Sequence, residues 1–204
     1  GGNVAENSGG PRGLKYGVTG DYVLGLEVVT PQGKVIRTGG QTIKNVTGYN
    51  LTKLIVGSEG TLGGVTDIIL RLIPKPQARV SLMAIFDSAI DSGKSISKVL
   101  SSGILPAAME IMDQECIKAV ENFKPSGLPT DAAAIVLIEL DGHPAAIKDE
   151  LEVVKAICEQ LGARRVELAH TPEEAAKLWE ARRMVSPAIA KIKPTKISED
   201  ATVP

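Results

Sequence analysis

The sequence predicts an α+β protein in two parts, and three observations support this prediction. Sixteen of the 21 glycines lie in residues 1–64, whereas residues 65–204 hold only five. The glycine-rich part contains β-branched runs joined by short turns, which is typical of antiparallel strands. In the part that follows, short apolar runs alternate with stretches whose apolar residues recur at helical spacing.

The glycine-rich part is expected to be a small antiparallel sheet flanked by loops. Three β-branched runs are predicted as its strands: Tyr22–Thr30, Lys34–Thr38 and Val65–Ile73. Pro31-Gln32-Gly33 is a turn, so the first two strands should form a β-hairpin. A short helix is expected near Asn50–Leu54. Residues 1–20 lack periodicity, which is typical of a loop.

One stretch of this part points to a ligand. Gly57–Val65 reads Gly-Ser-Glu-Gly-Thr-Leu-Gly-Gly-Val and leads into the third strand. Glycine lets a bulky group approach the backbone, and loops of this kind bring amide groups up to a ligand. A tight turn before a strand also explains these glycines. A single glycine-rich turn does not decide between the two interpretations.

The second part is predicted to be a ferredoxin-like domain. Four apolar runs are expected as strands: Arg79–Phe86, Ala107–Met112, Ala133–Leu140 and Arg164–Ala169. Helices are expected after them, over residues 88–101, 114–123, 144–161 and from Thr171 onward. The order β-α-β-(α)-β-α-β is the split βαβ arrangement. Pro187 should break or kink the last helix. With Pro74-Lys75-Pro76 as a boundary mark, we expect one domain over residues 1–77 and another over residues 78–204.

Composition excludes several classes of partner. A formal net charge of −1 and an aromatic content of 3% argue against nucleic-acid binding, and no apolar run has transmembrane length. Cys116 and Cys158 lie far apart without metal-ligand spacing, so we expect buried free thiols in a reducing cytosol. His143 and His170 precede helices and are interpreted as loop residues. Neither a metal site nor a Ser-His-Asp set is predicted.

Five motifs occur in a fixed order along the glycine-rich part. They are Gly9-Gly10; Lys15-Tyr16-Gly17 with Thr19 and Asp21; Leu26-Glu27-Val28-Val29 with Gly33; Gly57-Ser58-Glu59-Gly60-Thr61-Leu62-Gly63; and Leu70-Arg71-Leu72-Ile73-Pro74. Each motif alone is weak, but the ordered set is specific. The chain resembles the second half of the FAD-binding domain of the vanillyl-alcohol-oxidase-type flavoproteins, most closely their glycolate oxidase and D-lactate dehydrogenase group.

The resemblance implies the second half of an FAD-binding domain followed by a ferredoxin-like cap domain. FAD would lie between two α+β subdomains, with backbone amides of the Asn3–Gly10 and Glu59–Val65 loops facing it. The residues expected at the FAD site are Gly2, Asn3, Ala5, Glu6, Asn7, Ser8, Gly9, Gly10, Gly17, Asp21, Glu59, Gly60, Thr61, Leu62, Gly63, Gly64 and Val65. Gly64 departs from the family pattern, in which a branched apolar residue is usual. This departure would loosen the start of the strand or leave room near the cofactor.

The resemblance also implies a carboxylate-binding helix in the second domain. In the resembling enzymes an arginine shortly after a tryptophan contacts the substrate carboxylate, because its fork binds both oxygens. The matching position is Arg182, which follows Trp179 by three residues, and Arg183 is the alternative. Ser186 matches a small hydroxyl position of the same motif. Lys196 is expected as a second catalytic residue, although its spacing differs from that of the family by a gap.

The function expected from the resemblance is FAD-dependent oxidation of a small 2-hydroxy acid, such as glycolate or D-lactate. Expected partners are that acid, other subunits of an oxidase complex or an electron acceptor. The expected location is the cytoplasm, with peripheral attachment to the inner membrane through partner subunits as a further option. Gly1-Gly2-Asn3 and a terminal strand that is cut at residues 199–204 suggest a fragment, without the first FAD subdomain and the catalytic base. A non-catalytic α+β module that binds a small ligand or a protein remains the alternative.

Overall fold

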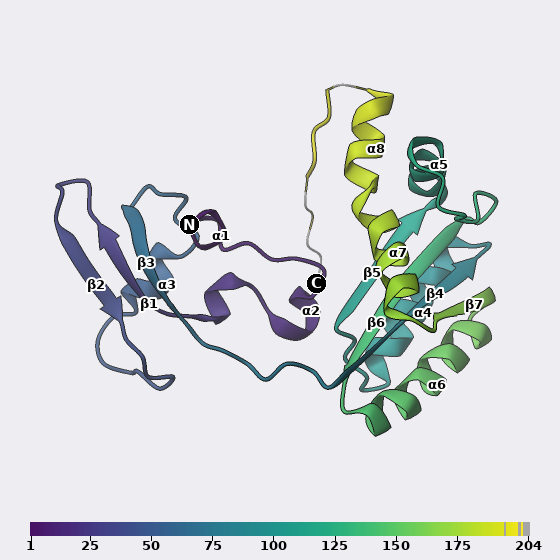
Figure 1. Cartoon of the computed structure of the whole chain (residues 1–204), viewed down its shortest axis with the longest axis horizontal. Coiled ribbons are helices and arrows are strands. Elements are labelled where there is room, and N and C mark those ends of the chain that lie inside the picture. Colours follow the sequence, from purple (N-terminus) through teal and green to yellow (C-terminus); the bar gives the residue numbers. More distant parts are fainter. Residues whose placement is uncertain (194, 200, 202–204) are drawn as a thin grey trace. The chain divides into compact units, whose positions relative to one another are not determined.

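The chain folds into two units, each built around its own antiparallel sheet (Figure 1). The computed structural model describes residues 1–193, 195–199 and 201. The first unit comprises Gly1–Lys75 and the second Pro76–Pro204. The predicted α+β class is confirmed. The strand expected at the end of the chain includes residues 200 and 202–204, which lie outside the described residues.

The sheet of the first unit has three strands in the order β2-β1-β3. They are β1 (Val23–Val29), β2 (Val35–Gly39) and β3 (Gly64–Leu70). The predicted hairpin is confirmed, since β1 and β2 pair antiparallel from Gly25↔Gly39 to Val29↔Val35. The short helix α3 (Leu51–Ile55) begins where Asn50 accepts a hydrogen bond from the Lys53 amide at 2.9 Å. This cap explains why the helix starts there.

Residues 1–20 are more ordered than the expected loop. They contain two short helices, α1 (Gly2–Ala5) and α2 (Gly13–Tyr16), and the 3-10 turn η1 (Thr19–Asp21). Each is a single turn, too short to show an apolar periodicity in the sequence. The prediction of a plain loop was therefore wrong in detail. Tertiary contacts with distant residues stabilise these turns.

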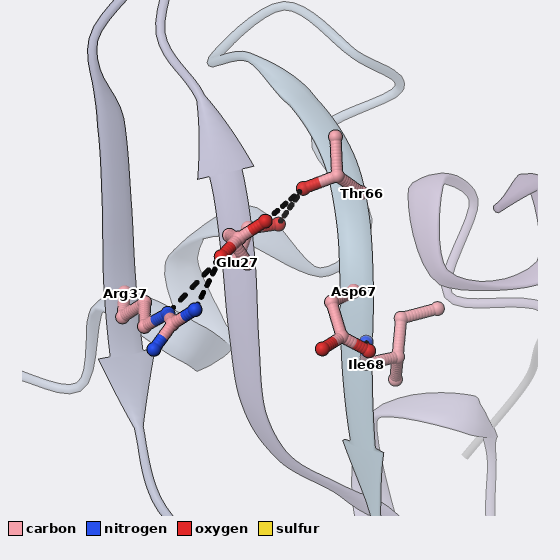
Figure 2. Close-up of polar contacts among 5 residues, drawn as sticks. All are labelled: Glu27, Arg37, Thr66, Asp67 and Ile68. Atoms are coloured by element: carbon pink, nitrogen blue, oxygen red, sulfur yellow. Dashed lines mark hydrogen bonds and ion pairs between the residues drawn. The ribbon is translucent and has the colours of Figure 1, made fainter.

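A polar ladder crosses the first sheet on the side opposite Leu26 and Val28. Figure 2 shows Glu27 of the central strand between Arg37 and Thr66. Arg37 donates from Nε and Nη2 to Glu27 Oε2 at 3.0 and 2.8 Å, and Thr66 Oγ1 donates to Glu27 Oε1 at 3.0 Å. The hydrogen bond from Arg37, and then that from Thr66, lowers the pKa of Glu27. The ladder links all three strands and leaves the opposite face for the core.

The sheet of the second unit has the strand order β5-β6-β4-β7, with every neighbouring pair antiparallel. Its strands are β4 (Ala78–Phe86), β5 (Ala108–Asp113), β6 (Ala134–Gly142) and β7 (Ala163–Ala169). β6 separates β4 from β5, and β4 separates β6 from β7. Each βαβ unit is therefore split by a strand of the other, which confirms the predicted ferredoxin-like arrangement.

Helices cover both faces of this sheet (Figure 1). They are α4 (Ala89–Ser101), α5 (Gln114–Phe123), α6 (Pro144–Gln160), α7 (Pro172–Arg183) and α8 (Val185–Ile192). α4 and α6 pack over Leu82, Ala84 and Phe86, whereas α5, α7 and α8 pack over Met83 and Ile85. Since successive strand residues point to opposite faces, burial of both faces requires an unbroken apolar run. This explains why the strands lack polar alternation.

The predicted helix ends are largely found. Ser88 and Thr171 cap α4 and α7 through their hydroxyls, and His143 Nδ1 accepts from the Ala145 amide at 3.3 Å at the start of α6. The break attributed to Pro187 lies at Met184, between α7 and α8. This position is expected because proline removes the hydrogen bond to the carbonyl of residue 183, four residues earlier.

Candidate functional site

The two glycine-rich loops of the first unit are hydrogen-bonded to each other. The Gly57 amide donates to the Val4 carbonyl at 2.9 Å, and the Glu59 amide donates to the Ala5 carbonyl at 2.8 Å. Gly57 and Glu59 both have positive φ, of 80° and 52°, so their backbone bends toward α1. The fold thus brings together two stretches that lie about fifty residues apart in the sequence.

Several side chains expected at the FAD site hold the loops in place. Asn7 Oδ1 accepts a hydrogen bond from the Gly20 amide at 2.7 Å, and the Ser8 carbonyl accepts one from Thr19 Oγ1 at 2.8 Å. Asp21 Oδ2 accepts from the Val18 amide at 2.9 Å, and this hydrogen bond is the main cause of its lowered pKa. Asn7 and Ser8 thus join the first loop to residues 19 and 20, whereas Asp21 closes the turn that begins at Val18. The sequence did not indicate these roles.

The same loops leave backbone amides available. Among the described residues, the amides of Gly9, Gly10, Gly60 and Leu62 have no hydrogen-bond acceptor. All four residues are exposed. Exposed amides on joined loops form the type of surface that receives anionic or polar ligand groups. The loops therefore suit a ligand with several acceptors.

The structure gives Gly63 a packing role that the sequence did not indicate. Its φ is 153°, and a Cβ there would lie 2.7 Å from both Val28 Cγ1 and the Val29 carbonyl oxygen. Close packing against β1 thus requires glycine at this position. Gly64 begins β3 with open space around a Cβ position. A Cβ at Gly10 would also meet open space.

A concavity of about 370 Å³ lies elsewhere in the first unit, lined mainly by residues 42–53. Asp21 lines this concavity, and its Oδ1 forms an ion pair with Lys53 Nζ at 3.4 Å. Arg71 lies on its wall, with its guanidinium 5.3 Å from the centre of the Tyr22 ring. Arg71 Nε is buried without an acceptor among the described residues. Asp21 is thus the one expected cofactor residue that also lines this concavity.

In the second unit, Arg182 is held by an acidic residue that the sequence analysis did not single out. Arg182 lies in the last turn of α7, and its Nε donates to Glu110 Oε2 of β5 at 2.9 Å. The side chains of Arg182 and Glu110 are 36% and 19% exposed. Both Nη atoms of Arg182 have no hydrogen-bond partner among the described residues, and neither is sealed from solvent.

Trp179 anchors the helix that carries Arg182. Its indole Nε1 donates to Ser81 Oγ of β4 at 3.1 Å, and its ring packs against the core under α7. Trp179 therefore has a packing role in the core of the second unit. Arg183 points to solvent, which favours Arg182 over Arg183 as a residue with a defined geometry.

The remaining substrate-side candidates lie together at the start of α8. Lys196 Nζ donates to Ser186 Oγ at 2.5 Å, and Ser186 follows Arg182 by four residues. Both side chains are exposed. The structure thus brings Ser186 and Lys196 together, as it does Arg182 and Glu110.

Other chemical groups of the described chain play smaller parts. Cys158 is buried as expected, but Cys116 is only half-buried. Within residues 1–193, 195–199 and 201, no three His, Cys, Asp or Glu side chains gather as a metal site. No helix among the described residues is long and apolar enough to cross a membrane.

Comparison with protein families places both units in one class. Residues 75–204 match the family described as FAD linked oxidases, C-terminal domain, and residues 1–39 match an FAD binding domain. The first match covers more than half of the chain. The chain therefore belongs to the FAD-linked oxidases, and FAD is the cofactor of the class.

Similar proteins narrow this class. The chain is 50% identical over its full length to glycolate oxidase subunit GlcD of Bacillus subtilis and 39% identical to that of Escherichia coli K12. It is 35% identical, over 98% of its length, to a D-lactate dehydrogenase of Archaeoglobus fulgidus. The chain spans 43%, 41% and 46% of these relatives, respectively.

Solved structures show the same fold. An alkyldihydroxyacetonephosphate synthase matches 94% of the chain with a TM-score of 0.73 and 22% identity, and the match covers 38% of that protein. The 4-ethylphenol oxidase from Gulosibacter chungangensis matches 85% of the chain with a TM-score of 0.61 and 19% identity, over 41% of its own length.

Proposed function

We propose that the chain is part of an FAD-dependent enzyme that oxidises a small 2-hydroxy acid to the 2-oxo acid. The observation that carries this proposal is the half-buried Arg182, whose two Nη atoms are unpaired, in a domain of the FAD-linked oxidases. A guanidinium with a free edge is suited to bind a carboxylate through two parallel hydrogen bonds. The names of the similar proteins, which refer to glycolate and D-lactate, support this class of substrate.

The residues of the first unit fit FAD. The exposed amides of Gly9, Gly10, Gly60 and Leu62 offer donors to phosphate or ring acceptors, and the open space at Gly10 allows close approach. We infer that the Asn3–Gly10 and Glu59–Val65 loops hold the cofactor mainly through backbone groups. Asn7 and Ser8 contribute by fixing the first loop against residues 19 and 20. Bound FAD supplies the hydride acceptor of the reaction.

The residues of the second unit would bind the acid. Arg182 binds and orients the carboxylate, which fixes the direction of the carbon that carries the hydroxyl group. Ser186 and Lys196, joined by their hydrogen bond, would offer a donor pair to a second oxygen of the substrate. The group that removes the hydroxyl proton is not assigned to any described residue.

Partners of the enzyme follow from the same relatives. Two similar proteins are named as subunits of a glycolate oxidase. We infer that the complete protein passes electrons to an acceptor or to another subunit. The cytoplasm is the proposed location.

The experiment is anaerobic flavin reduction in the full-length holoprotein. Glycolate, D-lactate and L-lactate are added in turn while the flavin absorbance is followed. The proposal expects bleaching by glycolate or D-lactate. It fails if the purified protein carries no flavin, which would favour a non-catalytic module, or if none of the acids bleaches it.

A further inference from the structure

Glu110 is an acidic side chain in an unusual place for a charge. It lies on the edge strand β5 between Ala108 and Met112, which point to the same face of the sheet. This face is covered by α5, α7 and α8, and Met112 belongs to its core. A charge that is largely removed from water is costly unless it is paired. Among the described residues, the Glu110 carboxylate is paired only with Arg182 Nε, at 2.9 Å.

The ion pair with Glu110 involves the Nε side of the Arg182 guanidinium and leaves its Nη1–Nη2 edge unpaired among the described residues. An arginine side chain carries one N–H on Nε and two on each Nη, in a rigid plane. Glu110 accepts from Nε only. The edge formed by Nη1 and Nη2 has no partner among the described residues and reaches solvent. This edge has the two parallel donors that a carboxylate binds bidentately.

The geometry points to Glu110 as the positioning residue of the carboxylate site: it holds Arg182 by Nε so that the Nη edge is presented to the substrate. This inference rests on the proposed function, which it deepens. Arginine has a long side chain with large rotamer freedom, and a fixed guanidinium loses less of that freedom when a carboxylate binds. Trp179 fixes the helix backbone through Ser81, and Glu110 fixes the arginine side chain.

The positioning role and simple electrostatics predict opposite changes in carboxylate affinity when Glu110 is removed, so the two can be distinguished. A negative charge beside Arg182 repels an incoming carboxylate. If Glu110 were only a counter-charge, its removal would tighten anion binding. If Glu110 positions Arg182, its removal weakens binding despite the loss of repulsion. Glu110→Gln separates the two effects, because the amide oxygen can still accept from Nε while the charge is gone.

The chain has a built-in reporter for the test. Trp179 is its only tryptophan and precedes Arg182 by three residues, so carboxylate binding can be followed by its emission. Oxalate is titrated at fixed ionic strength into the wild-type chain, Glu110→Gln and Glu110→Ala. Glu180→Ala is the matched control. It removes another carboxylate from α7, one that pairs with Lys124 at 2.6 Å. Circular dichroism verifies that each variant is folded.

The inference expects oxalate to bind to the wild type and at least as tightly to Glu110→Gln. Glu110→Ala should bind oxalate about tenfold more weakly, because Arg182 is no longer held in place and one of its charge-assisted contacts to oxalate is lost. Glu180→Ala should bind like the wild type. Equal or tighter binding by Glu110→Ala would overturn the inference, and so would a wild type that does not bind oxalate. A loss in Glu110→Gln equal to that in Glu110→Ala would also overturn it.

A second measurement separates this inference from the proposed function. In the full-length holoprotein, the KM for glycolate should follow the same order as the oxalate affinities. If the oxalate order holds but no 2-hydroxy acid reduces the flavin, the proposed function fails and the positioning role stands. If the flavin is reduced but Glu110→Ala has an unchanged or lower KM, the positioning role fails alone.

Discussion

The two units reach a defined structure by different means. Among the described residues, the core of the first unit contains six buried apolar residues, whereas each face of the second sheet buries twelve. The first unit depends on backbone geometry, on glycines with positive φ and on hydrogen bonds between loops. The second depends on packed side chains. A change of backbone conformation should therefore matter most in the first unit, and a change of side chain in the second.

The aromatic residues let each unit be followed separately. Tyr16, Tyr22 and Tyr49 are the only tyrosines and lie in the first unit, whereas Trp179 lies in the second. Tyrosine emission and tryptophan emission during urea unfolding thus report on different units.

The largest expected effect is on the first unit. Gly63→Val should destabilise it by about 3 kcal/mol, because the new side chain is strained at this φ and overlaps β1. Urea unfolding followed by tyrosine emission measures the loss, and the Trp179 transition should not move. In contrast, Gly64→Val should stabilise the first unit by roughly 0.5–1 kcal/mol, because its side chain meets open space in a strand. If both transitions shift together, the two units do not unfold independently.

The next effect concerns activity and not folding. Arg182→Ala in the full-length enzyme should lower kcat/KM by roughly ten- to two-hundred-fold, the loss of a charge-assisted bidentate contact. Flavin content should not change. Arg183→Ala is the control, because Arg183 is exposed. Steady-state kinetics would contradict the assignment if Arg183→Ala were the damaging change.

A smaller effect is expected from acid on the first unit. The pKa of Glu27 is lowered from its ordinary value of 4.5, mainly by the hydrogen bond from Arg37. Because the pKa of Glu27 is lower in the folded state, ionised Glu27 contributes to the free energy of unfolding above pH 4.5. This contribution is lost as the pH falls through the pKa of the folded state. Tyrosine-detected stability should therefore decline below this pH. Glu27→Gln should flatten the decline, and an unchanged pH profile in this variant would argue against the ladder.

The smallest effect concerns the two thiols of the second unit. Burial raises the pKa of both Cys116 and Cys158 to about 11. At pH 8 little thiolate exists, so alkylation by iodoacetamide should be slow and should accelerate as the pH rises toward 11. Half-buried Cys116 should react before buried Cys158. If Cys158 is labelled as fast as Cys116 in the Gly63→Val variant, the second unit does not keep its structure when the first unit is destabilised.

The sequence predicted the elements that depend on their own pattern. The strands of the second unit and the helices capped by Ser88 and Thr171 were found because apolar spacing and caps are local signals. The helical turns in residues 1–20 were missed because they are held by distant groups, such as the Gly57 and Glu59 amides. The residues next to these turns in the sequence do not indicate which distant groups will bind them.

The candidate site shows the same limit. Arg182 could be proposed from a family motif, but its partner Glu110 lies 72 residues away on another element. A glutamate in a strand gives no sign of its partner until the sheet and the helices are assembled. Likewise, the sequence did not indicate that a Cβ at Gly63 would overlap β1.

The central claim is that the first unit holds FAD through the backbone of its two loops. Gly10 is exposed, and a Cβ there meets nothing within the chain, so Gly10→Val should leave the fold intact. The most direct test is the flavin-to-protein ratio of the purified full-length variant, with Gly40→Val as the matched control, because a Cβ at Gly40 also meets open space and Gly40 lies outside both loops. The account predicts that Gly10→Val loses most of its flavin while Gly40→Val and the wild type keep it. A Gly10→Val protein with the flavin content of the wild type would contradict the account.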